Sequence, residues 1–250
     1  MQRKYESSQK NHYDEIAERY ADHYGDEYSQ KYRKVFIYDR LFSGENLANQ
    51  VVLEAMCGGG EATEYLVTNN ANVIGLDISL DELKIFKKRW INSDAICCSA
   101  YLAAFGNEVF DSLVVIGGLH HLQPEINLGI SEFHRVLKKG GTLYLCEPHK
   151  NSIPDLFRKI WYTFDNLFMK NESSIDIKKL INTNSNLFNF EVIGYFGGLA
   201  YLSIYNSMIL RIPIKAKKIY APFLLKIESL YMKSRHPRLS YFVLIKAISK

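Results

Sequence analysis

Short apolar runs alternate along the first 146 residues with longer segments in which apolar and polar residues are mixed. Five runs of four or five residues, bounded by turn-forming or charged residues, have the pattern of buried β-strands: 51–55, 72–76, 95–98, 112–116 and 142–146. The segments 80–90 and 126–137 have helical spacing. Alternating strands and helices predict a parallel sheet covered by helices on both faces. Right-handed crossovers then place all strand carboxyl ends at one edge, where open α/β sheets bind ligands.

The pattern changes after residue 146. Two helix-like stretches lie within 149–185, and the runs FNFEVIGYF (188–196) and SYFVLIKAI (240–248) predict two further strands. Roughly forty residues without a strand pattern separate these runs. Within them, 199–210 is strongly apolar, but Arg211 and Pro213 end it before the length of about 20 residues that a membrane-spanning helix needs.

The composition is that of an ordinary globular protein. The chain has 250 residues, of which 47% are hydrophobic and 23% charged, so it can bury a sizeable core. Basic residues begin the chain, but no apolar stretch follows them, and we therefore expect a cytoplasmic protein. Cys57, Cys97, Cys98 and Cys146 lie in apolar or glycine-rich runs without a Cys-x-x-Cys pair. This favours buried reduced thiols over disulfides, and we expect no metal site.

Basic charge is concentrated near the end of the sequence. Residues 211–238 hold eight basic residues and one acidic residue, a net charge of +7, in a chain whose net charge is +4. The simpler hypothesis is a helical cap whose apolar face covers the sheet and whose lysines, among them Lys215, Lys217 and Lys218, are solvated. The alternative is a basic amphipathic surface that rests on an anionic membrane or grips a phosphate-bearing acceptor.

The stretch VVLEAMCGGGEATEYL (51–66) runs from an apolar strand through three glycines into a helical pattern. Such a turn directs backbone N–H groups and a helix N-terminus at a ligand. A dinucleotide-binding loop needs Gly-x-Gly-x-x-Gly, but Thr63 stands where the third glycine should follow Gly58 and Gly60. The spacing therefore disfavours a nicotinamide cofactor.

Residues 10–148 resemble the class I S-adenosylmethionine-dependent methyltransferases, and in particular the group that includes ubiquinone-type and sugar methyltransferases. That family's loop reads apolar, apolar, acidic, any, Gly, any, Gly, any, Gly, and Glu54, Gly58 and Gly60 match it. Met56 departs from it, because a glycine normally lies there against the methionine part of the cofactor, and Cys57 follows. The resemblance implies that these residues bind S-adenosylmethionine (SAM), which reacts to S-adenosylhomocysteine.

Further motifs follow at the family's spacings. Asp77 ends VIGLDIS nineteen residues after Gly58, where the family's carboxylate accepts both ribose hydroxyls, and Ile78 would lie against the adenine. In AYLAAFGNEVFD, Ala100 would offer its backbone N–H to the ring, whereas Ser99 stands where the family commonly has an aspartate.

Three more segments complete the resemblance. SLVVIGGLHHL matches a strand that ends in glycines, which places Gly117 and Leu119 at the cofactor, and EFHRVLKKGGTLYLCEP matches the family's glycine hairpin. HYDEIAERYADHY resembles the aromatic lead-in helix, whose tyrosines, here Tyr13 and Tyr20, close over the cofactor.

The resemblance implies a Rossmann-like, doubly wound α/β fold with a mostly parallel seven-stranded sheet, whose last strand is antiparallel, plus a helical cap. It divides the chain into an N-terminal helical lid (1–40), a SAM-binding core (41–148) and a remainder (149–250) with the last core strands. The segments 149–185 and 197–239 would pack over the carboxyl edge of the sheet and shape an enclosed, apolar acceptor pocket.

For this family the resemblance implies methyl transfer to a small molecule, and a hydroxyl of a sugar, a lipid-linked precursor or a natural product is the first hypothesis for the acceptor. A hydroxyl needs a general base, and histidine has a suitable pKa. His120 is the first candidate, followed by His121 and His149 near the same sheet edge. Packing or bonding to the backbone is the alternative role of each.

Two other classes of function stay open. One is a methyltransferase acting on RNA or protein, although the basic charge is confined to one segment and we expect no nucleic-acid partner. The other is a non-catalytic partner subunit with this fold, which Met56 and Ser99 favour and the intact Gly58, Gly60 and Asp77 argue against. For the leading hypothesis we expect a small-molecule acceptor and, through residues 211–238, peripheral contact with the inner face of an anionic membrane.

Overall fold

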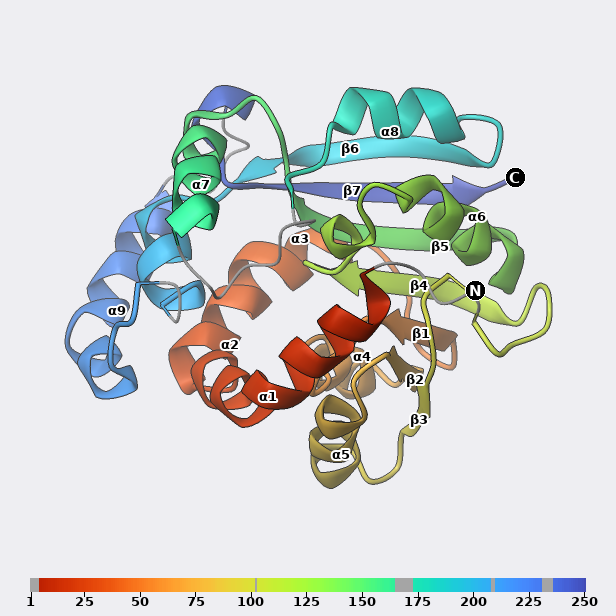
Figure 1. Cartoon of the computed structure of the whole chain (residues 1–250), viewed down its shortest axis with the longest axis horizontal. Helices are drawn as coiled ribbons and strands as arrows, with labels where there is room; N and C mark the ends of the chain where they lie inside the picture. Colours follow the sequence, from red (N-terminus) through yellow and green to blue (C-terminus); the bar gives the residue numbers. More distant parts are fainter. Residues whose placement is uncertain (1–4, 102, 165–172, 208–209, 231–235) are drawn as a thin grey trace.

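The computed structural model describes residues 5–101, 103–164, 173–207, 210–230 and 236–250. Its centre is a seven-stranded sheet with the strand order β3-β2-β1-β4-β5-β7-β6. The strands are β1 Val51–Ala55, β2 Asn72–Asp77, β3 Asp94–Cys97, β4 Phe110–Ile116, β5 Leu137–Pro148, β6 Phe188–Phe196 and β7 Phe242–Ser249. The first five strands pair in parallel, and β7 is antiparallel to both of its neighbours. The predicted mostly parallel sheet with an antiparallel last strand is therefore confirmed (Figure 1).

Helices cover both faces of this sheet. One buried layer packs Leu53, Leu113 and Leu145 against Ile130 and Phe133 of α6. The helices nearest the sheet are α4 Thr63–Thr68, α5 Leu80–Arg89, α6 Ile126–Val136 and α8 Ile177–Asn184. Successive strand residues point to opposite faces, so the neighbouring residues of each strand build the second layer.

The N-terminal segment divides between the lid and the core. Helix α1 Glu6–Tyr24 packs on α5, and α2 Glu27–Arg33 continues into a π-helix, η1 Lys34–Tyr38, and the short α3 Asp39–Leu41. Ile37 and Leu41 are fully buried against Val52 and Val114 of the sheet. The predicted lid boundary at residue 40 therefore falls inside the core, and only α1 extends over the sheet edge.

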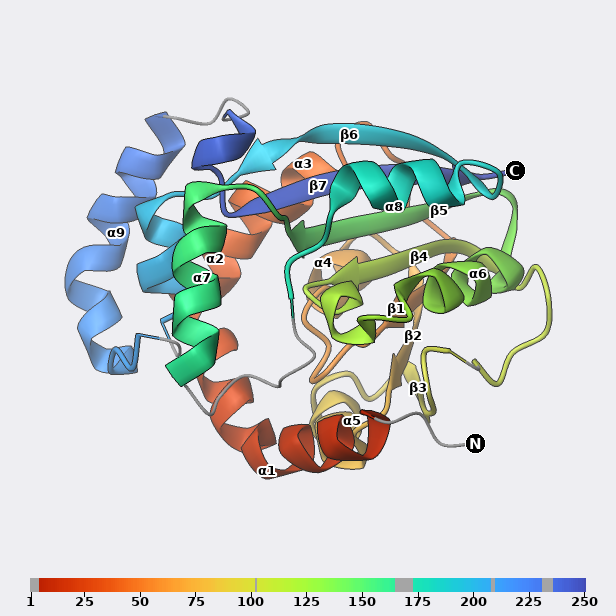
Figure 2. The same cartoon turned by 45° about the horizontal axis from the view of Figure 1, so that its top comes forward.

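The cap is built by α7 Ile153–Phe164, a π-helix η3 Tyr201–Tyr205, α9 Ile214–Leu230 and a short 3-10 helix η4 Pro237–Leu239. Figure 2 shows these elements beyond the carboxyl ends of β4 and β5. Helix α8 does not join them, because Ile177 and Leu180 share a buried cluster with α6 and cover the sheet instead. No helix among the described residues is long and apolar enough to cross a membrane.

Two buried ionic groups hold α9 to the rest of the protein. Lys217 is fully buried, forms an ion pair with Asp26 and lies 2.8 Å from the Ser29 hydroxyl oxygen. It therefore does not belong to the solvated lysines that the sequence predicted. Glu228 accepts a hydrogen bond from the Tyr32 hydroxyl at 3.0 Å.

The same Glu228 carboxylate also orders the chain that follows β6. It accepts hydrogen bonds from the backbone N–H groups of Gly198 and Ala200, both at 2.8 Å. One side chain of α9 thereby fixes both α2, through Tyr32, and the entry to η3.

The cysteines differ partly from the prediction. All four are free thiols, and Cys57 and Cys146 are buried. The expectation that all are buried is wrong for Cys97, which is exposed because β3 is the edge strand of the sheet and has a neighbour on one side only, and Cys98 after it is only half-buried.

We predict that Glu228→Ala lowers the free energy of unfolding by at least about 2 kcal/mol, because a buried hydroxyl and two buried N–H groups lose their acceptor. Equilibrium unfolding in urea would measure the change. Glu18→Ala, on the exposed side of α1, is the control and should shift stability by no more than about 0.5 kcal/mol. Equal effects of the two variants would show that Glu228 does not anchor the cap.

Candidate functional site

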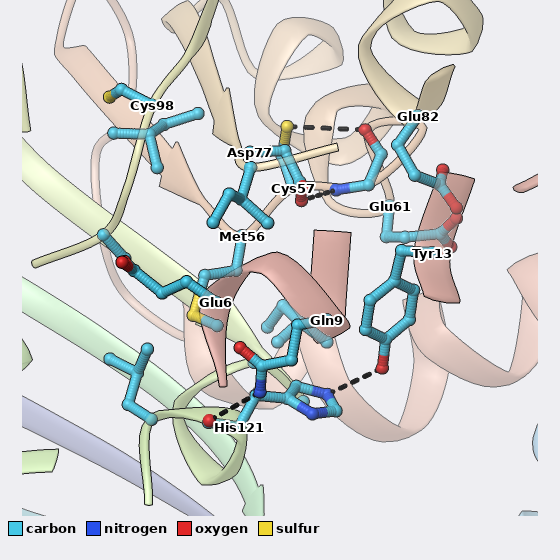
Figure 3. Close-up of a pocket in the computed structure, with 18 of the residues that line it drawn as sticks. Glu6, Gln9, Tyr13, Met56, Cys57, Glu61, Asp77, Glu82, Cys98 and His121 are labelled. Atoms are coloured by element: carbon cyan, nitrogen blue, oxygen red, sulfur yellow. Dashed lines mark hydrogen bonds between the residues drawn. The ribbon is translucent and has the colours of Figure 1, made fainter. Parts of the chain in front are cut away.

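A pocket opens at the carboxyl ends of β1, β2 and β4, beneath α1. Its wall includes nine of the predicted site residues: Tyr13, Met56, Cys57, Gly58, Asp77, Ile78, Ala100, Gly117 and His121. The remaining predicted residues lie behind or beside this wall, with two exceptions: His149 lies apart from it, and Tyr20 belongs to α1 but has a side chain outside the described part of the chain. Figure 3 shows the pocket from within.

The glycine loop takes its shape from positive φ angles. Met56, Gly58 and Gly60 have φ angles of 57°, 50° and 86°, in the region that glycine adopts most readily. At Gly60 a Cβ atom would also lie 2.3 Å from Nε1 of Trp90. The glycine at position 60 is therefore required by the packing of the residue that ends α5, whereas Gly58 contributes to the pocket wall itself.

Met56 occupies a left-handed conformation although it is not glycine. A residue with a Cβ atom pays roughly 1–2 kcal/mol for this conformation. Its side chain lies against Gly118, where an added Cβ atom would come within 2.9 Å of the Met56 Cβ atom and 3.1 Å of its Sδ atom. The thioether thus lies in the pocket wall, beside Gly118 at the end of β4.

Asp77 connects the loop to the second strand. Its Oδ2 atom accepts a hydrogen bond from the Gly58 N–H and its Oδ1 atom accepts one from the Ser79 N–H, both at 2.9 Å. Burial raises the pKa of this carboxyl, and the two N–H groups oppose that rise. Each oxygen retains lone pairs for a ligand in the pocket.

Helix α1 closes one side of the pocket. The Gln9 amide donates to the backbone oxygen of His121 at 2.8 Å, and the Tyr13 hydroxyl lies 3.1 Å from Nε2 of the same histidine (Figure 3). Glu6 of this helix bonds the Ser99 hydroxyl. Ser99 therefore contacts the lid, and α1 spans the pocket from the end of β3 to the end of β4.

The two adjacent histidines have different surroundings. The His121 ring lines the pocket, whereas the His120 ring is buried beside it, with ring centroids 4.1 Å apart. The Nδ1 atom of His120 lies 2.9 Å from Oε2 of Glu147. Glu147 also accepts hydrogen bonds from the backbone N–H groups of Leu119 at 2.7 Å and His120 at 3.4 Å. Leu119 is thus part of the support of the 3-10 helix η2 Leu119–Leu122 and not of the pocket wall.

His149 lies apart from this pocket. Its Nδ1 atom is 3.0 Å from the backbone oxygen of Lys150 and its Nε2 atom is 2.8 Å from the Ser240 hydroxyl. Its ring packs edge-on against Tyr195, and burial lowers its pKa. Both ring nitrogens are thus engaged, and the Nε2 contact holds the end of β5 to the segment before β7.

Glu54 lies behind the glycine loop. It accepts hydrogen bonds from the Ala62 N–H at 2.8 Å and the Thr63 hydroxyl at 2.5 Å, at the start of α4. Burial raises its pKa to about 7. It supports the loop from below and does not line the pocket.

Sequence reasoning missed several polar residues of the wall. Glu82 is buried beside the loop, 3.5 Å from where a Cβ atom on Gly58 would lie, and neither of its carboxyl oxygens has a hydrogen-bond partner among the described residues. Burial and the charge of Asp77 raise its pKa to about 8. Glu61 forms an ion pair with the fully buried Arg33 of α2. The only sequence signal for Glu82 was its position five residues after Asp77.

Among the described residues, no group of three or more His, Cys, Asp or Glu side chains is arranged to hold a metal ion. The site consists of a backbone loop, carboxylates at strand ends, and a histidine pair under a helical lid.

Comparison with known proteins gives the family of this domain. Residues 53–145 match the family model described as a methyltransferase domain. An uncharacterized methyltransferase of Synechocystis is 38% identical over 112 residues, which are 43% of this chain and 53% of the relative. A demethylmenaquinone methyltransferase of Clavibacter sepedonicus is 26% identical over 147 residues, 58% of this chain and 57% of the relative. The chain thus spans about half the length of the curated relatives it matches.

Solved structures agree on the fold. Magnesium protoporphyrin IX methyltransferase from Synechocystis, with bound SAM, aligns with a TM-score of 0.61 over 98% of this chain and 97% of its own, at 13% sequence identity. A SAM-dependent methyltransferase from Thermotoga maritima aligns with the same TM-score over 96% of this chain and 99% of its own, at 15% identity. Residues 53–145 therefore form a methyltransferase domain, and the chain has the fold of S-adenosylmethionine-dependent methyltransferases.

Proposed function

We infer that this chain transfers the methyl group of SAM to a hydroxyl of an apolar small molecule. The observation that carries this proposal is a buried glutamate and histidine, Glu147 and His120, beside a pocket that has the polar groups a nucleoside needs. Sugars, lipid-linked precursors and natural products are the acceptor classes with such a hydroxyl.

The pocket residues fit the proposed cofactor. Asp77 offers two carboxylate oxygens to ribose hydroxyls, and Glu82 adds a second carboxyl group beside the loop. Ile78, Ala100 and Leu122 provide apolar walls for a ring system. When bound, SAM supplies an electrophilic methyl group. The lid contacts of Gln9 and Tyr13 to His121 would keep water from that region.

Glu147 and His120 supply the base that a hydroxyl acceptor requires. Both carboxyl oxygens of Glu147 accept backbone N–H groups, an arrangement that suits an ionised acceptor for a proton on Nδ1 of His120. That bond fixes the tautomer in which Nε2 carries the lone pair. His120 then accepts the hydroxyl proton, and Glu147 acts through it as a positioning residue.

The alternatives fit the site less well. A macromolecular acceptor needs an open groove, whereas α1 lies across this pocket and contacts both its walls. Relatives of this chain are named for demethylmenaquinone, a small molecule. A non-catalytic partner subunit would not require the buried Glu147 and His120 pair. Peripheral contact of residues 211–238 with an anionic membrane belongs to the proposal, because a lipid-linked acceptor would be met at that surface.

We predict that Asp77→Ala weakens SAM binding by at least about tenfold, since two hydrogen bonds to a charged acceptor are worth roughly 1.5–3 kcal/mol each. Isothermal titration calorimetry measures the affinity. Asp94→Asn, on the exposed start of β3, is the control and should bind as the unaltered protein does. A change below about threefold for Asp77→Ala excludes the ribose role.

A transfer assay tests the reaction itself. With methyl-labelled SAM and a panel of alkyl phenols, quinols and alkyl glycosides, label should enter an organic-extractable product. His120→Ala should lower turnover by about 10²–10⁴ with nearly unchanged SAM affinity. His121→Ala, which removes the contact to Tyr13, should affect SAM affinity more than turnover. Label in RNA or protein alone would overturn the proposed acceptor class.

The third prediction concerns pH. Burial raises the pKa of Glu147 to about 8, so below that pH the pair with His120 holds one proton more than it does above. If His120 carries this extra proton, both of its ring nitrogens are protonated. If Glu147 carries it, the carboxyl donates to Nδ1 and the proton of the ring lies on Nε2. In both cases Nε2 of His120 cannot accept the hydroxyl proton. The turnover rate should therefore rise about tenfold per pH unit and level off near pH 8. Glu147→Gln should remove the step near pH 8, and a rate that falls through this range would contradict the assignment.

A further inference from the structure

Large apolar side chains are exposed in unusual number on the cap. They come from α7, α9 and η4, and from the segment between β6 and η3. The most exposed are Leu156 and Phe157 of α7, Leu199, three residues of α9 described below, and Leu239 of η4, with exposed fractions from 54% to 85%. A contiguous exposed apolar surface on a globular protein marks an interaction site.

On α9 the exposed apolar residues form one stripe. Ile219, Phe223 and Leu230 are 85%, 66% and 75% exposed. They are spaced by four and seven residues, so they lie on one side of the helix. The opposite side holds the buried Lys217, Ala221, Leu225 and Glu228. The stripe therefore faces away from the protein, and Figures 1 and 2 both show α9 at its outer edge.

An apolar groove runs beside this stripe. It has a volume of about 430 Å³ and lies between the start of α7, the segment 198–200, α9 and η4. Ile153, Leu199, Leu224, Ile227 and Leu239 line it. The carboxylate of Glu228 also reaches its wall, but three hydrogen bonds already engage it. The groove thus offers hydrocarbon contacts almost throughout, and its volume lies in the range of small-molecule pockets, which suits an alkyl or isoprenoid chain.

Basic residues border the same stripe. Lys215 and Lys226 lie four residues before Ile219 and Leu230, and Lys218 lies three residues after Lys215. All three are exposed, and none forms an ion pair with a described residue. The one acidic residue of α9, Glu228, is buried. An apolar stripe flanked by lysines has the composition of helices that lie in the interface of an anionic membrane.

We propose that the cap is a membrane-docking face. The stripe of Ile219, Phe223 and Leu230 enters the headgroup region of an anionic bilayer, Lys215, Lys218 and Lys226 contact the lipid phosphates, and the groove receives an apolar chain from the lipid. A second copy of this chain is a poorer occupant, because a symmetric contact would bring its lysines against the same lysines. Only the identity of the lipid's apolar chain in the groove rests on the proposed function, since vesicle binding needs neither SAM nor turnover.

Vesicle sedimentation tests the proposal with the full chain. At about 50 mM salt, where screening is weak, the protein should sediment with phosphatidylcholine vesicles that contain phosphatidylglycerol and stay in solution with phosphatidylcholine alone. Lys215→Gln, Lys218→Gln and Lys226→Gln together should lower the partition coefficient by about a hundredfold, at about fivefold per lysine. The matched control, Lys88→Gln, Lys178→Gln and Lys179→Gln, removes the same charge elsewhere and should bind as the unaltered protein does.

The apolar stripe has its own matched pair of variants. Ile219→Ser, Phe223→Ser and Leu230→Ser should together lower the partition coefficient at least about tenfold, whereas Val67→Ser, Ile91→Ser and Leu128→Ser, three exposed residues outside the cap, should not. Circular dichroism checks that each variant is folded. Equal loss in both sets, or no binding to anionic vesicles at about 50 mM salt, overturns the proposal.

Fluorescence quenching tests the orientation. A tryptophan introduced as Phe223→Trp should be quenched by lipids brominated on their acyl chains, and one introduced as Ile91→Trp should not. Concentration-dependent dimers in sedimentation velocity that are lost in the stripe variant would instead assign the face to a second copy. Vesicle binding without any methyl transfer would leave the docking face standing and remove only the proposed enzymatic function.

Discussion

The left-handed turn between β1 and α4 is the constraint on which the site depends. Every second residue of the turn, Met56, Gly58 and Gly60, has a positive φ angle. Asp77 holds the turn from outside by accepting a hydrogen bond from the Gly58 N–H. This contact exists because β1 and β2 are adjacent parallel strands, whose carboxyl ends meet at one edge.

The loop after β4 is held in the same way as the loop after β1. Glu147, at the carboxyl end of β5, accepts the backbone N–H groups that follow β4, as Asp77 of β2 does for the loop after β1. In both cases a buried carboxylate on one strand holds the loop of its neighbour. A buried carboxylate is costly unless it is hydrogen-bonded, so loop geometry and carboxylate position stabilise each other. The histidine pair is placed by this second contact.

The charged residues of α9 divide between the buried and the exposed side of the helix. On α9, Lys217 and Glu228 face inward, where Asp26, Tyr32 and backbone N–H groups satisfy them. Lys215 and Lys226 face outward on the same helix. Among the described lysines of α9, Lys217 therefore anchors the cap from inside, whereas Lys215, Lys218 and Lys226 are exposed.

The sequence by itself determined the sheet, the order of its motifs and the family, because strand periodicity and the spacing from Gly58 to Asp77 are local properties. Only the tertiary structure decided which polar groups share the pocket. Glu82 and Gln9 carry no motif, and His121 rather than His120 meets the lid, since the direction of a side chain depends on elements distant in sequence. Burial decided the rest: the same residue type is an anchor at Lys217 and a surface charge at Lys218, because successive residues of a helix point in different directions, here one into the core and the next into water.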